Sequence, residues 1–202
     1  RGVWGGSQYA VLFWLFALAI QVATNLHNDY ADFVKGADTE ERLGPKRAAQ
    51  QGLLTPEHLK RGTGVALVAA FLLGIPLIRR GGWPFVFIVP SSALNAVMYT
   101  GGPWPLGVLG LGEFSTGYNG LGDVLVLLYF GFVAVCGTYY LQALALPVEV
   151  IVAALPVGLL ATAIIVPNNL RDRVTDARVG KRTLAVRFGA RFARAEYATL
   201  VL

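Results

Sequence analysis

Long apolar runs alternate with short polar segments along most of the chain. A helix needs roughly 20 mostly apolar residues to cross a bilayer. Five runs approach or exceed that length, at residues 7–26, 62–78, 83–100, 121–144 and 147–167, and a sixth begins near Arg194. Because lipid offers no hydrogen-bond partners to open strand edges, such runs form helices. The pattern predicts an all-α, polytopic transmembrane helix bundle, and we read residues 1–202 as a single domain.

The composition agrees with a membrane protein. Hydrophobic residues make up 55% of the chain and charged residues only 14%, whereas soluble domains carry about 25% charged residues. The net charge is +5, but the basic residues flank apolar runs and do not alternate with aromatic residues on a polar surface. This arrangement excludes nucleic acid as the expected partner and favours a membrane surface or an anionic ligand held there.

The polar segments define two faces of the predicted bundle. One face carries residues 27–61, 101–120 and 168–194, and the other carries the N-terminus, 79–82 and 145–146. Fourteen of the seventeen lysines and arginines fall on the first face. Basic residues accumulate on the cytoplasmic side of membrane proteins. We therefore expect the first face to be cytoplasmic.

Two acidic clusters follow apolar runs on this face. Each consists of an asparagine and two aspartates spaced by about one helical turn, so that the three side chains share one helix face. The clusters are Asn25, Asp29 and Asp32 after the first run, and Asn168, Asp172 and Asp176 after the fifth. Both are followed by basic residues, among them Lys35 and Arg42 in the first cluster and Lys181 in the second. The two clusters form a weak internal repeat.

The repeat has a chemical explanation. Carboxylates one turn apart repel each other unless a cation lies between them. Mg²⁺ is commonly bound by one or two carboxylates together with substrate phosphates, and lysine or arginine side chains neutralise the remaining phosphate charge. Ordinary pairing of charges at solvated helix ends is the alternative interpretation. The same spacing at two equivalent positions, in acids close to membrane depth, favours a binding site.

Two long motifs extend these clusters: "NLHNDYADFVKGADTEERLGPKRAAQQGLLTPEHLKR" and "NNLRDRVTDARVGKRTLAVRFG". They resemble the signature regions of the UbiA-type intramembrane aromatic prenyltransferases. With "YTGGP" and "GYNGLGD", they are most similar to the branch that alkylates 1,4-dihydroxy-2-naphthoate in menaquinone or phylloquinone biosynthesis. The family fold has about nine transmembrane helices. The resemblance implies that this chain covers the second helix to the start of the seventh and is truncated at both ends.

The resemblance also implies a reaction and a site. The reaction is the Mg²⁺-dependent transfer of a polyprenyl group from a diphosphate to an aromatic acid, with loss of CO₂. Asp29, Asp32, Asp172 and Asp176 are the implied catalytic and metal-binding residues. The implied diphosphate-binding residues are Asn25, Lys35, Arg47, Asn168, Lys181 and Arg182. The expected location is a bacterial inner or plasma membrane with the site facing the cytoplasm, or a thylakoid membrane in a phototroph.

Some features depart from the family pattern or lack an assigned role. Gly36 stands where many relatives have a third aspartate, and Asp38 follows two residues later. Residues 108–117 resemble an insertion between "GPWPLG" and "YNGLGD". We also expect Tyr139 and Tyr140 to be candidates for lining the substrate cavity, with an interfacial aromatic belt as the alternative.

Other functions fit the pattern less well. The membrane phosphotransferases that act on CDP-alcohols need one dense aspartate motif, and this chain has two separated clusters. A cation transporter would place its acids near the bilayer midplane on broken helices. A UbiA-type enzyme with another acceptor, such as 4-hydroxybenzoate or homogentisate, remains open.

Overall fold

The computed structural model describes residues 6–37 and 44–202, and the chain is helical with no strand within these ranges. The long helices are α1 (Ser7–Val34), α2 (Pro56–Gly81), α3 (Trp83–Met98), α6 (Val148–Arg178) and α7 (Leu184–Val201). Between α3 and α6, the segments α4 (Gly122–Val126), η3 (Leu127–Val133, a π-helix) and α5 (Ala134–Ala143) join end to end. The all-α prediction is therefore confirmed.

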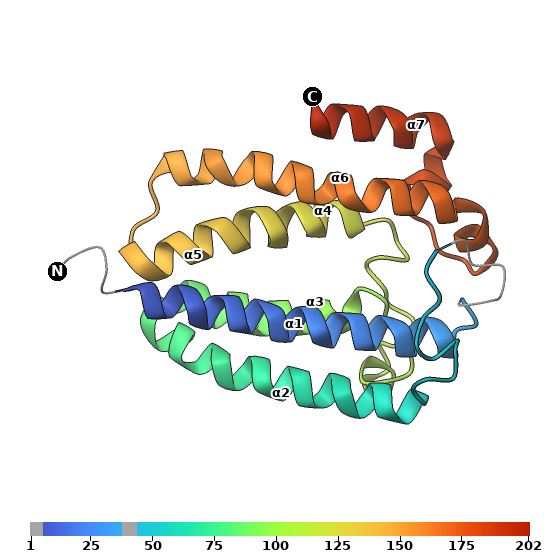
Figure 1. Ribbon diagram of the computed structural model, residues 1–202, viewed down its shortest axis with the longest axis horizontal. Helices are drawn as coiled ribbons and strands as arrows, with labels where there is room; N and C mark the ends of the chain where they lie inside the picture. Colours follow the sequence, from blue (N-terminus) through green and yellow to red (C-terminus); the bar gives the residue numbers. More distant parts are fainter. Residues whose placement is uncertain (1–5, 38–43) are drawn as a thin grey trace.

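In the part of the chain that the structure describes, four helical stretches are long and apolar enough to cross a membrane: α1, α2, the continuous α4–α5 stretch and α6. The third predicted span corresponds to α3, which is apolar but only 16 residues long. It ends at Met98, two residues before the predicted end. The long helices lie roughly parallel, as a membrane bundle requires (Figure 1).

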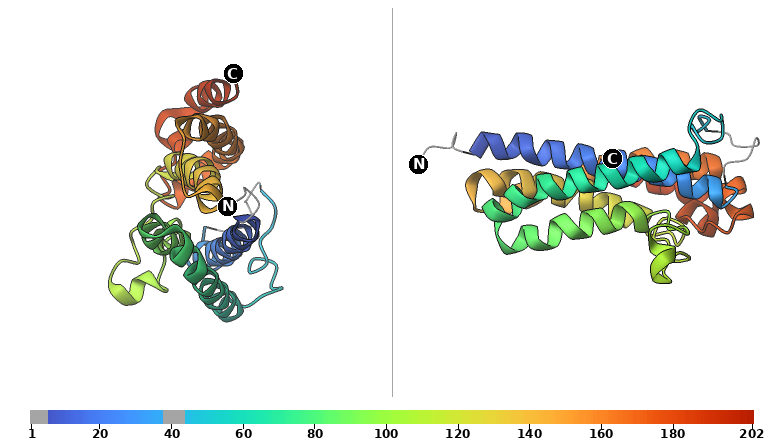
Figure 2. Two further views of the ribbon diagram at one scale, coloured as in Figure 1. Left: turned by 90° about the vertical axis from the view of Figure 1, so that its left-hand side faces the viewer. Right: turned by 90° about the horizontal axis from the view of Figure 1, so that it is seen from below.

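The helices are arranged in two groups. Helices α1, α2 and α3 form one group, α4–α5 and α6 form the other, and α7 lies on the outer side of α6 (Figures 1 and 2). At one end, an apolar cluster that includes Phe13, Phe85 and Leu141 joins the groups. The Arg80 guanidinium donates hydrogen bonds to the carbonyls of Leu141 and Gln142, at 2.9 and 3.1 Å. The other end carries the polar segments.

Several predicted boundaries are wrong in the same way. The first and fifth runs were expected to end at residues 26 and 167, but α1 and α6 continue to Val34 and Arg178. Residues 27–34 and 168–178 are therefore helical. The spacing of the acidic clusters had predicted this, although the same residues were counted among the polar segments between the spans. Hydropathy marks only the part of a helix that is apolar, whereas the helix itself continues until its backbone is terminated. Helix α7 likewise begins at Leu184, ten residues before the predicted start, with a break at Gly189 (φ 82°).

Candidate active site

A cavity of about 560 Å³ lies between α1, α3 and the α4–α5 stretch. Its walls are mostly apolar, with Phe13, Trp14 and Phe130 among them, and this volume is within the range of ligand-binding sites. Polar side chains gather at the end nearest the acidic clusters. These are Asn25, Asn28, Asn95 and Tyr99. The cavity therefore combines an apolar body with a polar mouth.

Tyr139 and Tyr140, the candidates for lining the cavity, are not among the residues of its walls. Tyr140 stacks on Phe85, with ring centroids 6.4 Å apart, and Tyr139 borders a separate cleft between α5 and α6. Neighbouring helical residues point about 100° apart, so a pair of aromatics cannot be placed from sequence without the helix orientation. The aromatic residues that this helix contributes to the cavity are Tyr129 and Phe130.

Both residues lie in the π-helical segment η3. Its Gly131 lies against Gly158 of α6, where a Cβ on Gly131 would come within 2.7 Å of the Gly158 Cα atom. This close approach holds the α4–α5 stretch against α6. Single π-helical turns are frequent at functional sites because they re-aim side chains within a continuous helix.

Helices α1 and α6, which carry the acidic clusters, end with the same type of turn. In α1, the amides of Gly36 and Ala37 donate to the carbonyls of Phe33 and Asp32; in α6, those of Gly180 and Lys181 donate to Ala177 and Asp176. Both glycines are left-handed, at φ 70° and 76°, as this termination motif requires. The structure thus explains why glycine occupies position 36.

This shared turn changes the register of the internal repeat. Counted from the terminating glycine, Asp32 of α1 is equivalent to Asp176 of α6, and Asn28 is equivalent to Asp172. The sequence pairing had matched Asn25, Asp29 and Asp32 with the three residues of α6. Asn28 was missed, although its four-residue spacing from Asp32 equals the spacing between Asp172 and Asp176.

Asp29 faces the segment that follows α1. It is only 8% exposed, and its two carboxylate oxygens accept hydrogen bonds from the backbone amides of Ala48 and Ala49, at 3.1 and 3.3 Å. The carboxylate therefore fastens the chain between α1 and α2 onto the bundle. Its assignment as a metal ligand stays a prediction.

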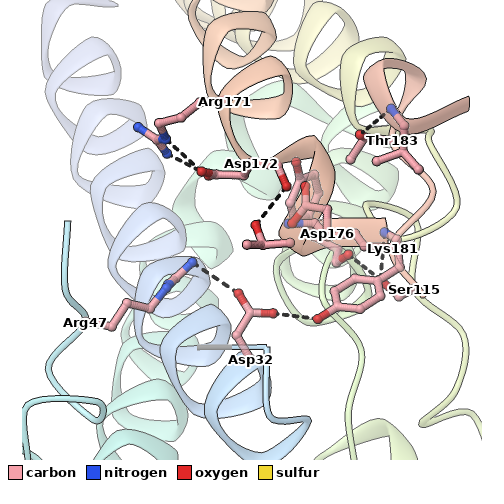
Figure 3. A network of polar contacts seen from close by, with 12 residues as sticks. Asp32, Arg47, Ser115, Arg171, Asp172, Asp176, Lys181 and Thr183 are labelled. Carbon is pink, nitrogen blue, oxygen red and sulfur yellow. Dashed lines mark hydrogen bonds and ion pairs between the residues drawn. The ribbon is translucent and has the colours of Figure 1, made fainter. Parts of the chain in front are cut away.

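Asp32 lies at the centre of a polar network (Figure 3). One carboxylate oxygen accepts a hydrogen bond from the Arg47 guanidinium at 3.1 Å, and the other accepts one from the Tyr118 hydroxyl at 2.9 Å. The Lys35 ammonium lies 4.2 Å from the centre of the Tyr118 ring and donates to the carbonyl of Thr100. Burial lowers the pKa of Lys35, while Asp32 opposes this shift.

The α6 cluster lies opposite Asp32 (Figure 3). Asp172 accepts two hydrogen bonds from Arg171, each 2.7 Å long. Asp176 lies 3.4 Å from the Lys181 ammonium and close enough to both Asp32 and Asp172 for their charges to interact. The structure therefore brings the two acidic clusters together, as the sequence predicted.

Tyr118 connects the two clusters. Besides its bond to Asp32, its ring lies 5.5 Å from the Lys181 ammonium, and its carbonyl accepts a hydrogen bond from the Arg182 amide at 2.7 Å. The Ser115 hydroxyl accepts from the Tyr118 amide and donates to the Tyr99 carbonyl. Sequence reasoning quoted "GYNGLGD" but assigned Tyr118 no role, because nothing in the motif shows which distant carboxylate its hydroxyl reaches.

Tyr99 responds to the same charges. Burial, and then the carboxylates of Asp123, Asp32 and Asp176, raise the pKa of Tyr99 to about 12. Its phenol therefore keeps its proton at physiological pH, and Tyr99 is one of the residues that line the cavity.

The remaining predicted residues lie less centrally. The side chains of Asn168 and Arg182 are exposed, and the contact of Arg182 with Tyr118 comes from its backbone. Asp38 and Arg42 lie outside the described residues. Within the described ranges, no three His, Cys, Asp or Glu side chains lie close enough to hold a metal ion by themselves.

These features define a class of protein: a helical membrane protein in which an apolar cavity lies beside facing acidic clusters and partly buried lysines. Residues 2–202 match the UbiA prenyltransferase family, and the chain belongs to that family. It is an integral membrane protein.

Known relatives agree with this assignment. The chain is 40% identical to the 1,4-dihydroxy-2-naphthoate octaprenyltransferase of Haemophilus influenzae and 38% identical to that of Escherichia coli, over 94% and 96% of its length. It is 31% identical to UbiA prenyltransferase domain-containing protein 1 of Homo sapiens, over 91% of its length and 52% of the relative's. The alignments cover 62% and 61% of the two bacterial relatives. No solved structure matches the chain.

Proposed function

We propose that this protein transfers a polyprenyl group from a prenyl diphosphate to an aromatic acid. The proposed acceptor is 1,4-dihydroxy-2-naphthoate, and the product is a precursor of menaquinone or phylloquinone. The names of the bacterial relatives support this acceptor. We further propose that the site faces the cytoplasm of a bacterial-type plasma membrane, or the corresponding side of a thylakoid membrane, because the basic segments gather at this end.

One observation carries the proposal. The lysines Lys35 and Lys181 and the carboxylates Asp32 and Asp176 surround Tyr118 at the polar end of an apolar cavity. A prenyl diphosphate has the matching shape, with a highly charged head and a long hydrocarbon tail. The apolar walls would hold the tail and keep water from the reacting carbon.

The acidic residues fit Mg²⁺. Asp32, Asp172 and Asp176 supply hard oxygen donors, and although no three of them form a complete cage, Mg²⁺ bound with phosphates commonly takes only one or two carboxylates. When bound, Mg²⁺ would act as a Lewis acid that stabilises negative charge on the diphosphate. Arg47, Arg171 and Lys181 now pair with these carboxylates.

The chain's own residues have defined tasks in this proposal. Lys35, Lys181 and Arg47 donate hydrogen bonds to the diphosphate, which takes the electron pair when its bond to the first prenyl carbon breaks. The electron-rich ring of the acceptor then forms a bond to that carbon. The ring carbon that forms this bond also carries the carboxylate. When the carboxylate leaves as CO₂, the electron pair of its bond to the ring returns to the ring. Tyr99, protonated, is placed to hold an acceptor oxygen at the cavity mouth.

The test is product analysis. Membranes containing the full-length protein are incubated with isotope-labelled prenyl diphosphate and a panel of 1,4-dihydroxy-2-naphthoate, 4-hydroxybenzoate and homogentisate, with Mg²⁺ or with EDTA. We expect a decarboxylated, prenylated naphthoquinol product by mass spectrometry, formed only with Mg²⁺. A product from another acceptor would transfer the assignment to another branch of the family. Cation flux without diphosphate consumption would overturn the enzymatic proposal.

A further inference from the structure

The segment between α3 and α4 carries an unusual apolar surface at the polar end of the bundle. Val108 and Leu109 are 78% and 72% exposed, and Leu111 and Phe114 about half exposed. Residues 101–120 contain no lysine or arginine and one charged residue, Glu113. The other two segments at this end carry all fourteen of its basic residues. The composition of this segment therefore favours apolar surroundings, whereas the two basic segments favour water and anionic groups.

The exposed side chains lie on a folded unit. Residues Leu106–Leu109 form a short 3₁₀ helix, η2, and Leu106 is buried beneath it. The amide of Leu111 donates to the carbonyl of Leu106 at 2.9 Å, and the amide of Gly102 donates to that of Gly112 at 2.8 Å. These bonds close the segment into a compact loop that holds its apolar residues outward.

The loop points sideways from the bundle. Figure 2, in the end-on view, shows the yellow-green segment projecting away from the helix axes beside α3. In a membrane protein, a sideways projection at the helix ends enters the plane of the headgroups. Helix α3, which precedes the loop, also exposes apolar side chains, among them Phe87 and Leu94.

The depth of the loop is marked by its own tryptophan. The partly buried Trp104 ring lies 5.8 Å from the Lys60 ammonium and packs edge-on against the buried ring of Tyr30. Tryptophan concentrates at the membrane–water interface, and lysine extends from there to the headgroups. We propose that residues 106–114 insert into the boundary between headgroups and acyl chains of the bilayer in which the protein lies.

This insertion has a consequence for the site. The inserted loop leads directly into Ser115 and Tyr118, which hold Tyr99 and Asp32. A lipid anchor at one end of this segment fixes the depth of Tyr118, at the other end, relative to the bilayer. It also gives residues 108–117, which resemble an insertion, a physical role.

The experiment measures depth directly. Residues 1–202 contain one cysteine, Cys136. A background with Cys136→Ser, and with any cysteine outside these residues also replaced by serine, allows single labels at Leu109→Cys and, independently, at Val108→Cys, with an environment-sensitive fluorophore. The control is His58→Cys, an exposed position at the start of α2. The full-length protein is reconstituted in phosphatidylcholine vesicles with or without spin-labelled lipids, and aqueous iodide is the opposing quencher.

We expect labels at 108 and 109 to emit at shorter wavelength than the label at 58, to be quenched by shallow spin-labelled lipid, and to be severalfold less sensitive to iodide. Equal iodide quenching at all three positions would overturn the proposal. So would protection that disappears when the protein is diluted in lipid, because a second copy would then cover the loop. The proposal depends on membrane location alone, so its failure would leave prenyl transfer untouched.

Discussion

The two acidic helix ends share a backbone and differ in what holds their side chains. Both α1 and α6 stop at a left-handed glycine one turn after an aspartate. In α1, the partners of the acids come from distant segments: the amides of Ala48 and Ala49, Arg47 and Tyr118. In α6, the partners found among the described residues include Arg171, adjacent to Asp172, and Lys181, five residues after Asp176.

This difference suggests that the acids of the two clusters do not all have the same role. Within the described residues, α6 and the turn that ends it supply a cation beside each acid of the α6 cluster, Arg171 beside Asp172 and Lys181 beside Asp176. The α1 cluster forms only when the loop from residue 44 and the Tyr118 loop are both in place. We infer that Asp29 serves this assembly, whereas Asp32 serves the ligand together with Asp172 and Asp176. The two clusters would then have equal sequence spacing and unequal roles.

The largest expected effect falls on the equivalent acids Asp32 and Asp176. Replacing either carboxylate with an amide, as Asp32→Asn or Asp176→Asn, removes a negative oxygen from the proposed metal and diphosphate site. We expect turnover of labelled prenyl diphosphate to fall by at least about 100-fold, the usual cost of one preorganised group. Glu57→Gln, which changes an exposed acid at the start of α2, is the matched control. Near-normal turnover in Asp176→Asn would contradict the proposed site.

Asp29→Asn should act on stability first. The asparagine retains one acceptor oxygen and turns an N–H group toward a backbone amide, which costs about 1–3 kcal/mol for a buried partner left unsatisfied. We expect the variant to melt at a lower temperature in detergent. At temperatures well below its melting temperature, we expect it to keep part of its turnover. Asp172→Asn is the comparison, because this carboxylate pairs with the neighbouring, partly exposed Arg171. If Asp29→Asn melts normally but is inactive, Asp29 is a ligand residue, as the sequence first indicated.

Much of this comparison could be read from the sequence, and the limits are physical. Spacing placed Asp172 and Asp176 on one face, and apolar length identified the helices on which the clusters lie. Asp29 and Asp32 are also close in spacing, but only the tertiary partners distinguish them. No feature of the sequence around the two aspartates shows that the backbone amides of Ala48 and Ala49 donate to Asp29. Nor does it show that the Tyr118 hydroxyl donates to Asp32. The predicted span ends at residues 26 and 167 fall short of the helix ends for a related reason, because hydropathy does not report where charged residues continue a helix.

Tyr118 offers a way to sharpen the comparison, because it touches both clusters. Tyr118→Phe removes the hydrogen bond to Asp32 and keeps the ring beside Lys35 and Lys181. We expect kcat/KM for prenyl diphosphate to fall roughly tenfold, as for one hydrogen bond to a charged group. Tyr118→Leu also removes the ring face and should cost more, through cation–π contacts. Equal activity of the two variants would show that the ring contributes nothing to the placement of the lysines.

The smallest effect is expected at Arg171, and it tests the local character of the α6 cluster. The Arg171–Asp172 pair is well formed, but 35% of the arginine side chain is exposed. Such pairs contribute less than about 1 kcal/mol to stability. Arg171→Gln should therefore leave the melting temperature nearly unchanged. If the guanidinium turns to the diphosphate when substrate binds, the same variant should raise KM for prenyl diphosphate several-fold while kcat stays close to normal. A large loss of stability would instead show that the α6 cluster, like the α1 cluster, is held by its charge partner.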